Sequence, residues 1–201
     1  MDWELSIKHA ICGFLPLIAV LAVYFIILFA AKKKQTIAHI IASFVFCFYL
    51  IGILSMTGIW WFRSFSPDFN WIPFVDMIRG PVDTVLNVVL FVPLGLFLPV
   101  LYKRFDKIWR VTLAGLLISL SVEIVQMFGC GSTDINDLMT NTIGACLGYF
   151  VFLLVNKIIS KPWLKSLQDE GAQCYYELPI FWASAMLIMT TIQLPIFHTF
   201  F

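Results

Sequence analysis

The sequence has few charged residues. Of its 201 residues, 13 are Lys or Arg and 12 are Asp or Glu, so charged side chains make up only 12% of the chain, whereas apolar residues make up 61%. The mean hydropathy is +0.92. Soluble domains carry about 25% charged residues, so this composition excludes an ordinary soluble domain and indicates a polytopic membrane protein. The length leaves room for about six spans and excludes a large separate enzyme domain.

The sequence also lacks the features of a nucleic-acid-binding protein and of several enzyme classes. The net charge is +1, and no basic face is available for nucleic acid. Five cysteines are scattered without a CxxC motif or a close Cys/His pair, which argues against a zinc or redox site, and no cofactor is predicted. The histidines His9, His39 and His198 are equally dispersed, and their positions favour the membrane interface over catalysis. No nucleophile elbow, HExxH motif or P-loop occurs.

Long apolar runs predict six membrane-spanning helices, so the expected fold is an all-α polytopic transmembrane bundle. The first run ends in three lysines, whereas a secretory signal carries its positive charge before the apolar run, so we expect a retained helix. The predicted spans are Ile11–Ala31, Ile37–Trp60, Thr84–Tyr102, Val111–Phe128, Asn141–Ile159 and Leu178–Phe200.

The positive residues predict how the chain is oriented in the cell membrane. The first, third and fifth loops together hold ten Lys or Arg residues, whereas the opposite side holds three. Because positive residues accumulate in cytoplasmic loops, both termini are expected outside.

The sequence also suggests three regions. Residues 1–70 hold the first two helices, residues 71–159 hold helices three to five, and residues 160–201 hold a cytoplasmic loop and helix six. The polar stretch Lys161 to Glu177 is expected to form a loop or a short interfacial helix, and we assign it no chemistry.

Polar residues of helices three and four are predicted to gather near the outer side. Gly80 can cap the third helix with Pro81 as its first residue, which places Asp83 in the first turn and Asn87 one turn deeper. Taken alone, Asp83 is adequately explained as a helix start signal.

The fourth helix carries a clearer polar stripe. Gly115, Ser119, Glu123 and Gln126 follow at helical spacing, and Glu123 lies roughly 7 Å below the outer boundary. A carboxylate at that depth needs a partner, a proton or a water-filled cleft. The alternative is a protonated carboxyl that hydrogen-bonds a neighbouring helix.

A second stripe runs down the fifth helix. Asp134 and Asp137 stand at its entry, Asn141 follows one turn deeper, and Gly144 and Gly148 complete the stripe. The two glycines are spaced for close helix packing, which is our preferred interpretation of them. Asp134 can act as an N-cap, but capping leaves the second aspartate unexplained.

We expect the three helices to converge on one outward-open polar pocket, with Arg79 as the counter-charge. An excess of carboxylates allows a metal cation, protons or a cationic ligand, and the choice between these options stays open. An arginine beside carboxylates could instead bind a phosphate or carboxylate head group. The candidate ligand-binding residues are Arg79, Asp83, Asn87, Glu123, Gln126, Asp134, Asp137 and Asn141.

The ordered motifs from the second loop through helix five resemble the VanZ-like family. They are Ile72-Pro73-Phe74, Asp83-x-x-x-Asn87-x-x-x-Phe91-x-Pro93-Leu94-Gly95, Glu123-x-x-Gln126, and Asp134-x-x-Asp137-x-x-x-Asn141-Thr142-x-Gly144-x-x-x-Gly148. Each motif is weak alone, but the ordered set over Trp71 to Ile159 is fairly specific. Family members often carry an arginine just before the first aspartate of the last motif, whereas this chain has Gly131, Ser132 and Thr133 there. If that arginine sets the ligand's charge, this chain differs in ligand.

The resemblance implies a bacterial cell-envelope protein associated with low-level resistance to the glycopeptide teicoplanin, by a route that does not require altered peptidoglycan termini. On this interpretation the protein binds rather than catalyses, and its partners are membrane lipid and a glycopeptide antibiotic or a lipid-linked cell-wall precursor. An enzyme or transporter acting on such a precursor is the alternative, with the carboxylates as acid/base, metal or proton-relay groups. In a third interpretation the polar residues only hold three helices together.

Overall fold

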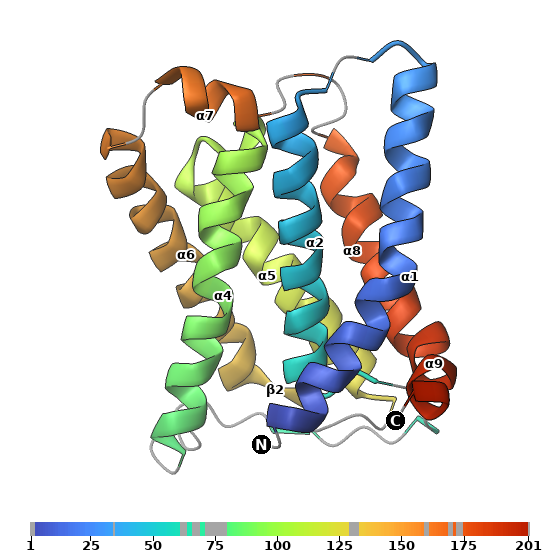
Figure 1. The fold of residues 1–201 in the computed structure, drawn as a ribbon. Helices are drawn as coiled ribbons and strands as arrows, with labels where there is room; N and C mark the ends of the chain where they lie inside the picture. Colours follow the sequence, from blue (N-terminus) through green and yellow to red (C-terminus); the bar gives the residue numbers. More distant parts are fainter. Residues whose placement is uncertain are drawn as a thin grey trace. The chain divides into compact units, whose positions relative to one another are not determined.

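The computed structural model describes residues 3–33, 35–60, 64–65, 69–70, 80–128, 133–158, 161–168, 171 and 175–200. Within these ranges the chain is almost entirely helical (Figure 1). Among the described residues, six helical segments are long and apolar enough to span a membrane: Glu4–Ala30, Ile37–Met56, Pro81–Leu101, Ile108–Gln126, Ile135–Ile158 and Glu177–Phe200. The prediction of an all-α bundle with six spans is confirmed.

The described residues form the following helices in chain order. They are α1 (Trp3–Ala30), α2 (Ile37–Met56), α4 (Pro81–Leu101), the 3₁₀ turn η1 (Lys103–Phe105), α5 (Ile108–Gln126), α6 (Ile135–Ile158), α7 (Lys161–Leu167), α8 (Glu177–Leu187), the π-helical turn η3 (Ile188–Ile192) and α9 (Gln193–Phe200). The polar stretch that begins at Lys161 thus contains a short helix. The last predicted span is built from α8, η3 and α9 in succession.

Local sequence signals explain where several helices begin. Thr36 caps α2 by accepting a hydrogen bond from the backbone N–H of His39 at 3.1 Å. Gly80 is the N-cap of α4 and Pro81 opens that helix, as the sequence predicts. The helix α6 begins at Ile135, six residues before the predicted start of the span, because its first turns are polar and hydropathy does not register them.

Two short strands were not predicted. The strand β1 (Phe69–Asn70) pairs in parallel with β2 (Thr133–Asp134), which directly precedes α6. The pairing ties the start of α6 to a segment from the connection between the second and third spans.

The chain forms two compact units. Unit 1 consists of Met1–Phe62 together with Gly171–Phe201, and unit 2 is the intervening segment Arg63–Glu170. These bounds differ from those of the three regions suggested by the sequence, because the first two helices and the last span belong to the same unit.

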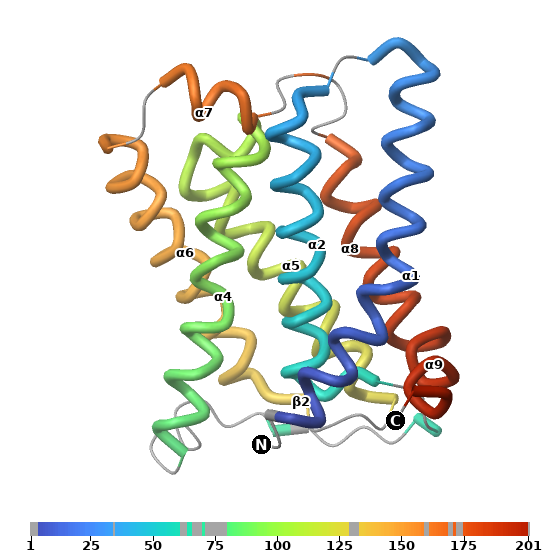
Figure 2. Tube along the Cα trace, viewed as in Figure 1, coloured from blue at the N-terminus to red at the C-terminus, as the bar shows by residue number. Residues whose placement is uncertain are grey.

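In unit 1, α1 packs against α2 and against the last span. Figure 2 shows α1 in blue beside α8 and α9 in red, in agreement with their contacts. Fully buried side chains on α1 and α2, among them Leu17, Leu21, Phe46 and Leu50, form the apolar interior of this unit.

In unit 2, α4 and α6 are in close contact along much of their length, and α5 packs beside α6. Glycines permit this approach. A Cβ added to Gly148 would overlap the carbonyl oxygen of Val92 and lie 2.8 Å from the Cα of Gly95. A Cβ on Gly144 would likewise overlap the carbonyl oxygen of Val88. The backbones of α4 and α6 can touch only because these positions lack side chains.

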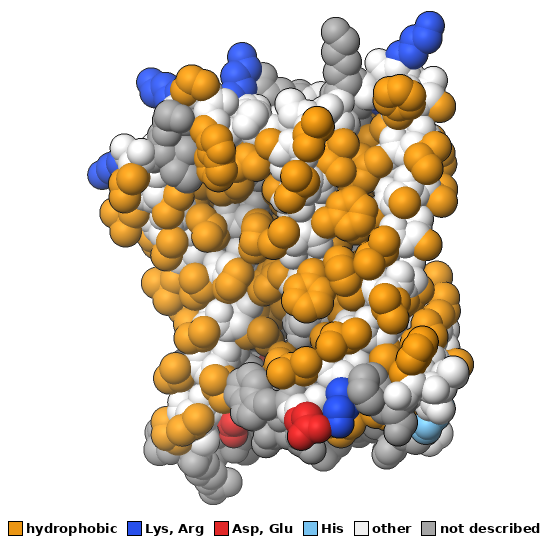
Figure 3. All heavy atoms as spheres, in the orientation of Figure 1, with side chains coloured by type: hydrophobic (Ala, Val, Ile, Leu, Met, Phe, Trp, Pro, Cys, Tyr) orange, Lys and Arg blue, Asp and Glu red, His pale blue; other side chains and the backbone are white. Residues whose placement is uncertain are grey.

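The outer surfaces of the helices are apolar. In Figure 3, hydrophobic side chains cover the visible helices along their length, and Lys and Arg side chains gather near the helix ends. Large apolar side chains such as Ile26, Phe29 and Leu154 are at least 60% exposed, which suits contact with lipid tails. These features are those of a multi-pass protein of the cell membrane.

Candidate functional site

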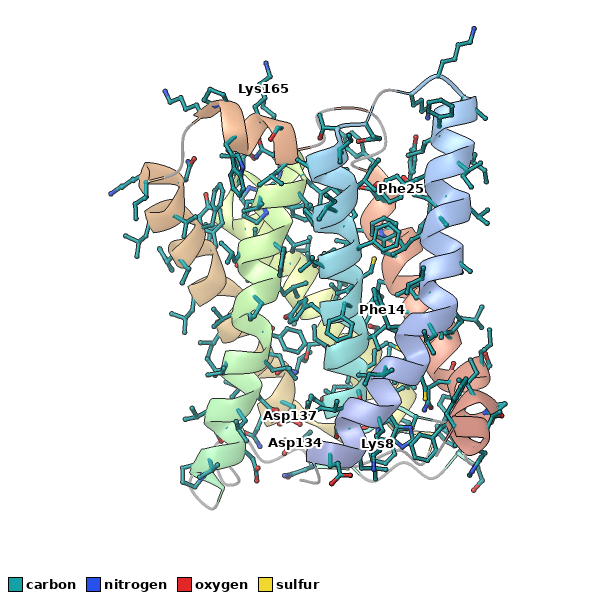
Figure 4. All side chains as sticks on the ribbon, in the orientation of Figure 1. Lys8, Phe14, Phe25, Asp134, Asp137 and Lys165 are labelled. Carbon is teal, nitrogen blue, oxygen red and sulfur yellow. The ribbon has the colours of Figure 1, made fainter. Side chains whose placement is uncertain are left out.

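Polar side chains of unit 2 gather where α4 begins, α5 ends and α6 begins. We use the name polar cluster for Asn87, Ser119, Glu123, Asp134, Asp137 and Asn141. Figure 4 shows the labelled Asp134 and Asp137 at the start of α6. The cluster joins the three helices that the sequence predicts to converge.

One hydrogen bond connects α4 with α6. The Nδ2 of Asn87 donates to Oδ1 of Asp137 at 2.6 Å, and both residues are half-buried. A short bond from an amide to a carboxylate is stronger than one between neutral groups. Asp137, which capping could not explain, therefore has a role in joining two helices.

Glu123 connects α5 with the start of α6. Its side chain is 3% exposed, and its Oε2 accepts a hydrogen bond from the backbone N–H of Asp134 at 2.8 Å. The hydroxyl of Thr133 donates to the backbone carbonyl of Glu123 at 3.2 Å. The carboxyl groups of Asp134 and Asp137 lie near enough to interact with Glu123 electrostatically. Three acidic groups thus share a small volume at the end of α5.

Asp134 caps α6, as predicted. Its Oδ1 accepts hydrogen bonds from the backbone N–H and the Nδ2 of Asn136, at 2.7 and 2.8 Å. Its Oδ2 accepts a hydrogen bond from Nδ2 of Asn70 at 3.3 Å, so β1 also contributes to the site.

The cluster continues one turn deeper into the helices. The Nδ2 of Asn141 donates to the hydroxyl of Ser119 at 3.0 Å, and both side chains are at most 2% exposed. The Oδ1 of Asn141 is buried and has no hydrogen-bond partner among the described residues. A buried amide oxygen of this kind can accept a hydrogen bond from a ligand, a proton donor or a water molecule.

The remaining predicted site residues are placed differently. Gln126 is buried near the end of α5, on the same face as Glu123. Asp83 is exposed in the first turn of α4, which agrees with its simpler interpretation as a helix start signal. The predicted counter-charge Arg79 lies outside the described residues. Within the described ranges, no group of three His, Cys, Asp or Glu residues is arranged to hold a metal ion.

Sequence reasoning missed several polar residues. Asn136 was not singled out, although its position two residues after a helix-capping aspartate could have suggested it. His9 and His39, which the sequence predicts at the membrane interface, are buried within the protein, at 4% and 1% exposed. His39 is hydrogen-bonded to Glu177, which lies in a stretch to which no chemistry was assigned.

His9 has an unusual environment in unit 1. Its ring stacks between Trp60 and Phe197, with ring centroids 4.3 and 4.2 Å away. The Nε2 of Gln193 donates to its Nδ1. Because Gln193 and Phe197 come from the far end of the chain and Trp60 follows α2, no local pattern could have revealed these partners.

Six apolar helices with lipid-facing surfaces define the chain as a multi-pass integral membrane protein. A protein-family model described as VanZ/LLP1 matches residues 14–156. The chain therefore belongs to the VanZ family. The match begins well before Trp71, where the resemblance seen in the motifs starts.

The chain is also similar to a protein from Enterococcus faecium named Protein VanZ. The two are 42% identical over 99 residues, which cover 48% of this chain and 59% of the relative. The match thus spans little more than half the length of that relative. No solved structure matches the chain significantly.

Proposed function

We propose that this protein lowers the susceptibility of a bacterium to teicoplanin through the polar cluster of unit 2. Membership of the VanZ family and the similarity to Protein VanZ support an envelope role of this kind. The lipid tail of teicoplanin would let the antibiotic approach a membrane protein from the bilayer.

The observation that carries the proposal is the burial of Glu123 within a membrane-spanning helix, beside two further carboxyl groups. Acidic groups inside a bilayer are costly and are functional by default. Packing alone would be served better by neutral side chains, which bring no desolvation cost. The cluster supplies mainly hydrogen-bond acceptors, so it suits a ligand that carries amine or amide donors.

A second candidate function is transport or modification of a lipid-linked envelope precursor. Closely spaced carboxyl groups can relay protons or act as acid and base, and this is the observation that favours the second candidate. It predicts turnover or transport in proteoliposomes that contain a lipid-linked precursor.

The test is the susceptibility of a Gram-positive host that expresses the wild type, Glu123→Gln or Asp137→Asn at matched membrane levels. We expect wild type to protect against teicoplanin more than against vancomycin, and both variants to lose that protection. Asp106→Asn is the matched control. Asp106 is an exposed aspartate that pairs with Arg110 at the start of α5, whereas Glu123 lies near the end of that helix.

Three outcomes separate the interpretations. Retained protection in both variants would contradict the role of the polar cluster. A parallel fall in protein level and protection would favour the interpretation in which the cluster only holds helices together. No protection by wild type would remove the resistance role and favour the lipid-linked precursor.

A further inference from the structure

Unit 1 contains a buried acid–base pair that the proposed function does not use. The Nε2 of His39 lies 3.0 Å from Oε2 of Glu177, and the two side chains are 1% and 0% exposed. His39 is in the first turn of α2 and Glu177 is the first residue of α8, so 138 residues separate them. Both belong to membrane-spanning segments, and Glu177 lies beyond the residues matched by the family model.

The burial of this pair restricts its charge. A carboxylate beside a neutral imidazole leaves one net negative charge away from water, which is costly in a membrane protein. Uptake of one proton from water, forming an N–H or an O–H bond, makes the pair neutral overall. Because either group can hold that proton, it belongs to the pair rather than to one residue.

The pair is not saturated with hydrogen bonds. The Oε1 of Glu177 is buried without a hydrogen-bond partner among the described residues, and the same holds for the hydroxyl of Ser43, one turn along α2 from His39. An ion pair that serves only stability normally has its remaining oxygen satisfied. The carboxylate oxygen of Glu177 and the hydroxyl of Ser43 can each form a hydrogen bond that the described residues do not supply, either with a proton donor or with a water molecule.

The surroundings indicate the side from which protons arrive. Near the pair, Lys33 donates from its Nζ to the hydroxyl of Tyr176 at 3.0 Å, and both side chains are exposed. Tyr176 directly precedes Glu177. The sequence predicts that this end of unit 1, which carries the first lysine cluster, is cytoplasmic.

The opposite direction along α2 is closed by apolar side chains. Leu50, Ile51 and Leu54 are fully buried. Such a layer disfavours water on that side, whereas His39 lies in the first turn of α2, next to the lysine-bearing end.

We infer that His39 and Glu177 form a proton-binding site that exchanges one proton with water at the end of unit 1 that carries Lys32 and Lys33. Among the described residues, the other titratable or charged groups near this site are Cys47 on α2, Tyr24 on α1, and Lys33 with Tyr176 at the boundary. Cys47 lies near enough to feel the charge on Glu177, and Tyr24 packs edge-on against Phe181, one turn after Glu177.

The experiment counts protons bound by the purified full chain in detergent as pH is varied between about 5 and 9. Infrared difference spectra report the protonation of buried carboxyl groups in the same samples. We expect Glu177→Gln to remove about one titrating proton per chain together with one buried-carboxyl signal. His39→Gln should shift the titration of that signal.

Two control variants accompany these measurements. Glu4→Gln changes a carboxylate that is 79% exposed, and His198→Gln changes an exposed histidine. Both controls should leave the buried-carboxyl signal intact. Glu123→Gln should remove a different buried signal, which separates this site from the polar cluster.

If Glu177→Gln titrates like the wild type, or if the buried signal does not respond to pH, the pair is a fixed structural contact and the inference is wrong. If the variants fail to fold, nitrogen-15 spectra of labelled histidine in the wild type decide the question. A His39 signal that changes with pH supports the inference, and an invariant signal overturns it. None of these results depends on whether the protein protects against teicoplanin, so this inference and the proposed function can fail separately.

Discussion

Gly148→Ala tests the close backbone contact between α4 and α6. The added methyl group would meet three atoms of α4: the carbonyl oxygen of Val92, the Cα of Gly95 at 2.8 Å and the backbone N of Leu96 at 2.9 Å. All three are backbone atoms, which cannot rotate away as a flexible side chain could. The helices α4 and α6 must therefore separate.

The expected change in the free energy of unfolding for Gly148→Ala follows from two opposing effects. Overpacking a tight interface costs about 1 to 3 kcal/mol, and three backbone contacts place this position near the upper figure. Replacing glycine by alanine within a helix stabilises the helix by about 1 kcal/mol. The net destabilisation should be about 2 kcal/mol, which is roughly a 30-fold change in the unfolding equilibrium.

The control is Gly52→Ala, because a Cβ at Gly52 meets nothing within 4 Å. It should be neutral or stabilise the protein by up to about 1 kcal/mol. Reversible unfolding in mixed detergent micelles, followed by circular dichroism, measures both variants. Equal stability of Gly148→Ala and Gly52→Ala would refute the inference that backbone contact between α4 and α6 holds unit 2 together.

The remaining predictions concern individual polar contacts. A double-mutant cycle with Asn87→Ala and Asp137→Ala should give a coupling energy of about 0.6 to 2 kcal/mol in the same unfolding assay, and additive effects would contradict the hydrogen bond between α4 and α6. Ser119→Ala should cost about 1 kcal/mol because it leaves the amide of Asn141 without its acceptor, and a stability unchanged from wild type would argue against that contact. His9→Ala removes two ring-stacking contacts and should cost about 2 kcal/mol, which a fall in the thermal midpoint would reveal; an unchanged midpoint would show that the stack contributes nothing.

Much of the fold follows from patterns within single segments. Uninterrupted apolar runs located the spans, since a membrane crossing requires about 20 such residues wherever they occur. Spacing along one helix predicted that Ser119 and Glu123 share a face, and spacing along the next predicted the same for Asp137 and Asn141. The start of α6 was misplaced because hydropathy does not register a polar first turn.

Contacts between distant segments could not be predicted in the same way. The pairing of His39 with Glu177 depends on how α2 and α8 are packed, and neither helix has a sequence pattern from which the other could be identified as its neighbour. The same reason applies to the stacking of His9 and to the contact of Asn70 with Asp134. The pairing of β1 with β2 involves two residues on each side, which is too short for any strand signal.

The division of unit 1 between the two ends of the sequence has a consequence for biosynthesis. Its first two helices enter the membrane early, but α8 and α9 are translated only after the whole of unit 2. Until then Gln193 and Phe197, which contact His9, and Glu177, which pairs with His39, have not been synthesised, so two polar side chains lie in the bilayer without these partners. Unit 2 is continuous and can assemble during translation. The nascent protein therefore has a late, vulnerable interval in which quality-control proteases can recognise the incomplete unit 1, and ribosome stalling before α8 should favour its degradation.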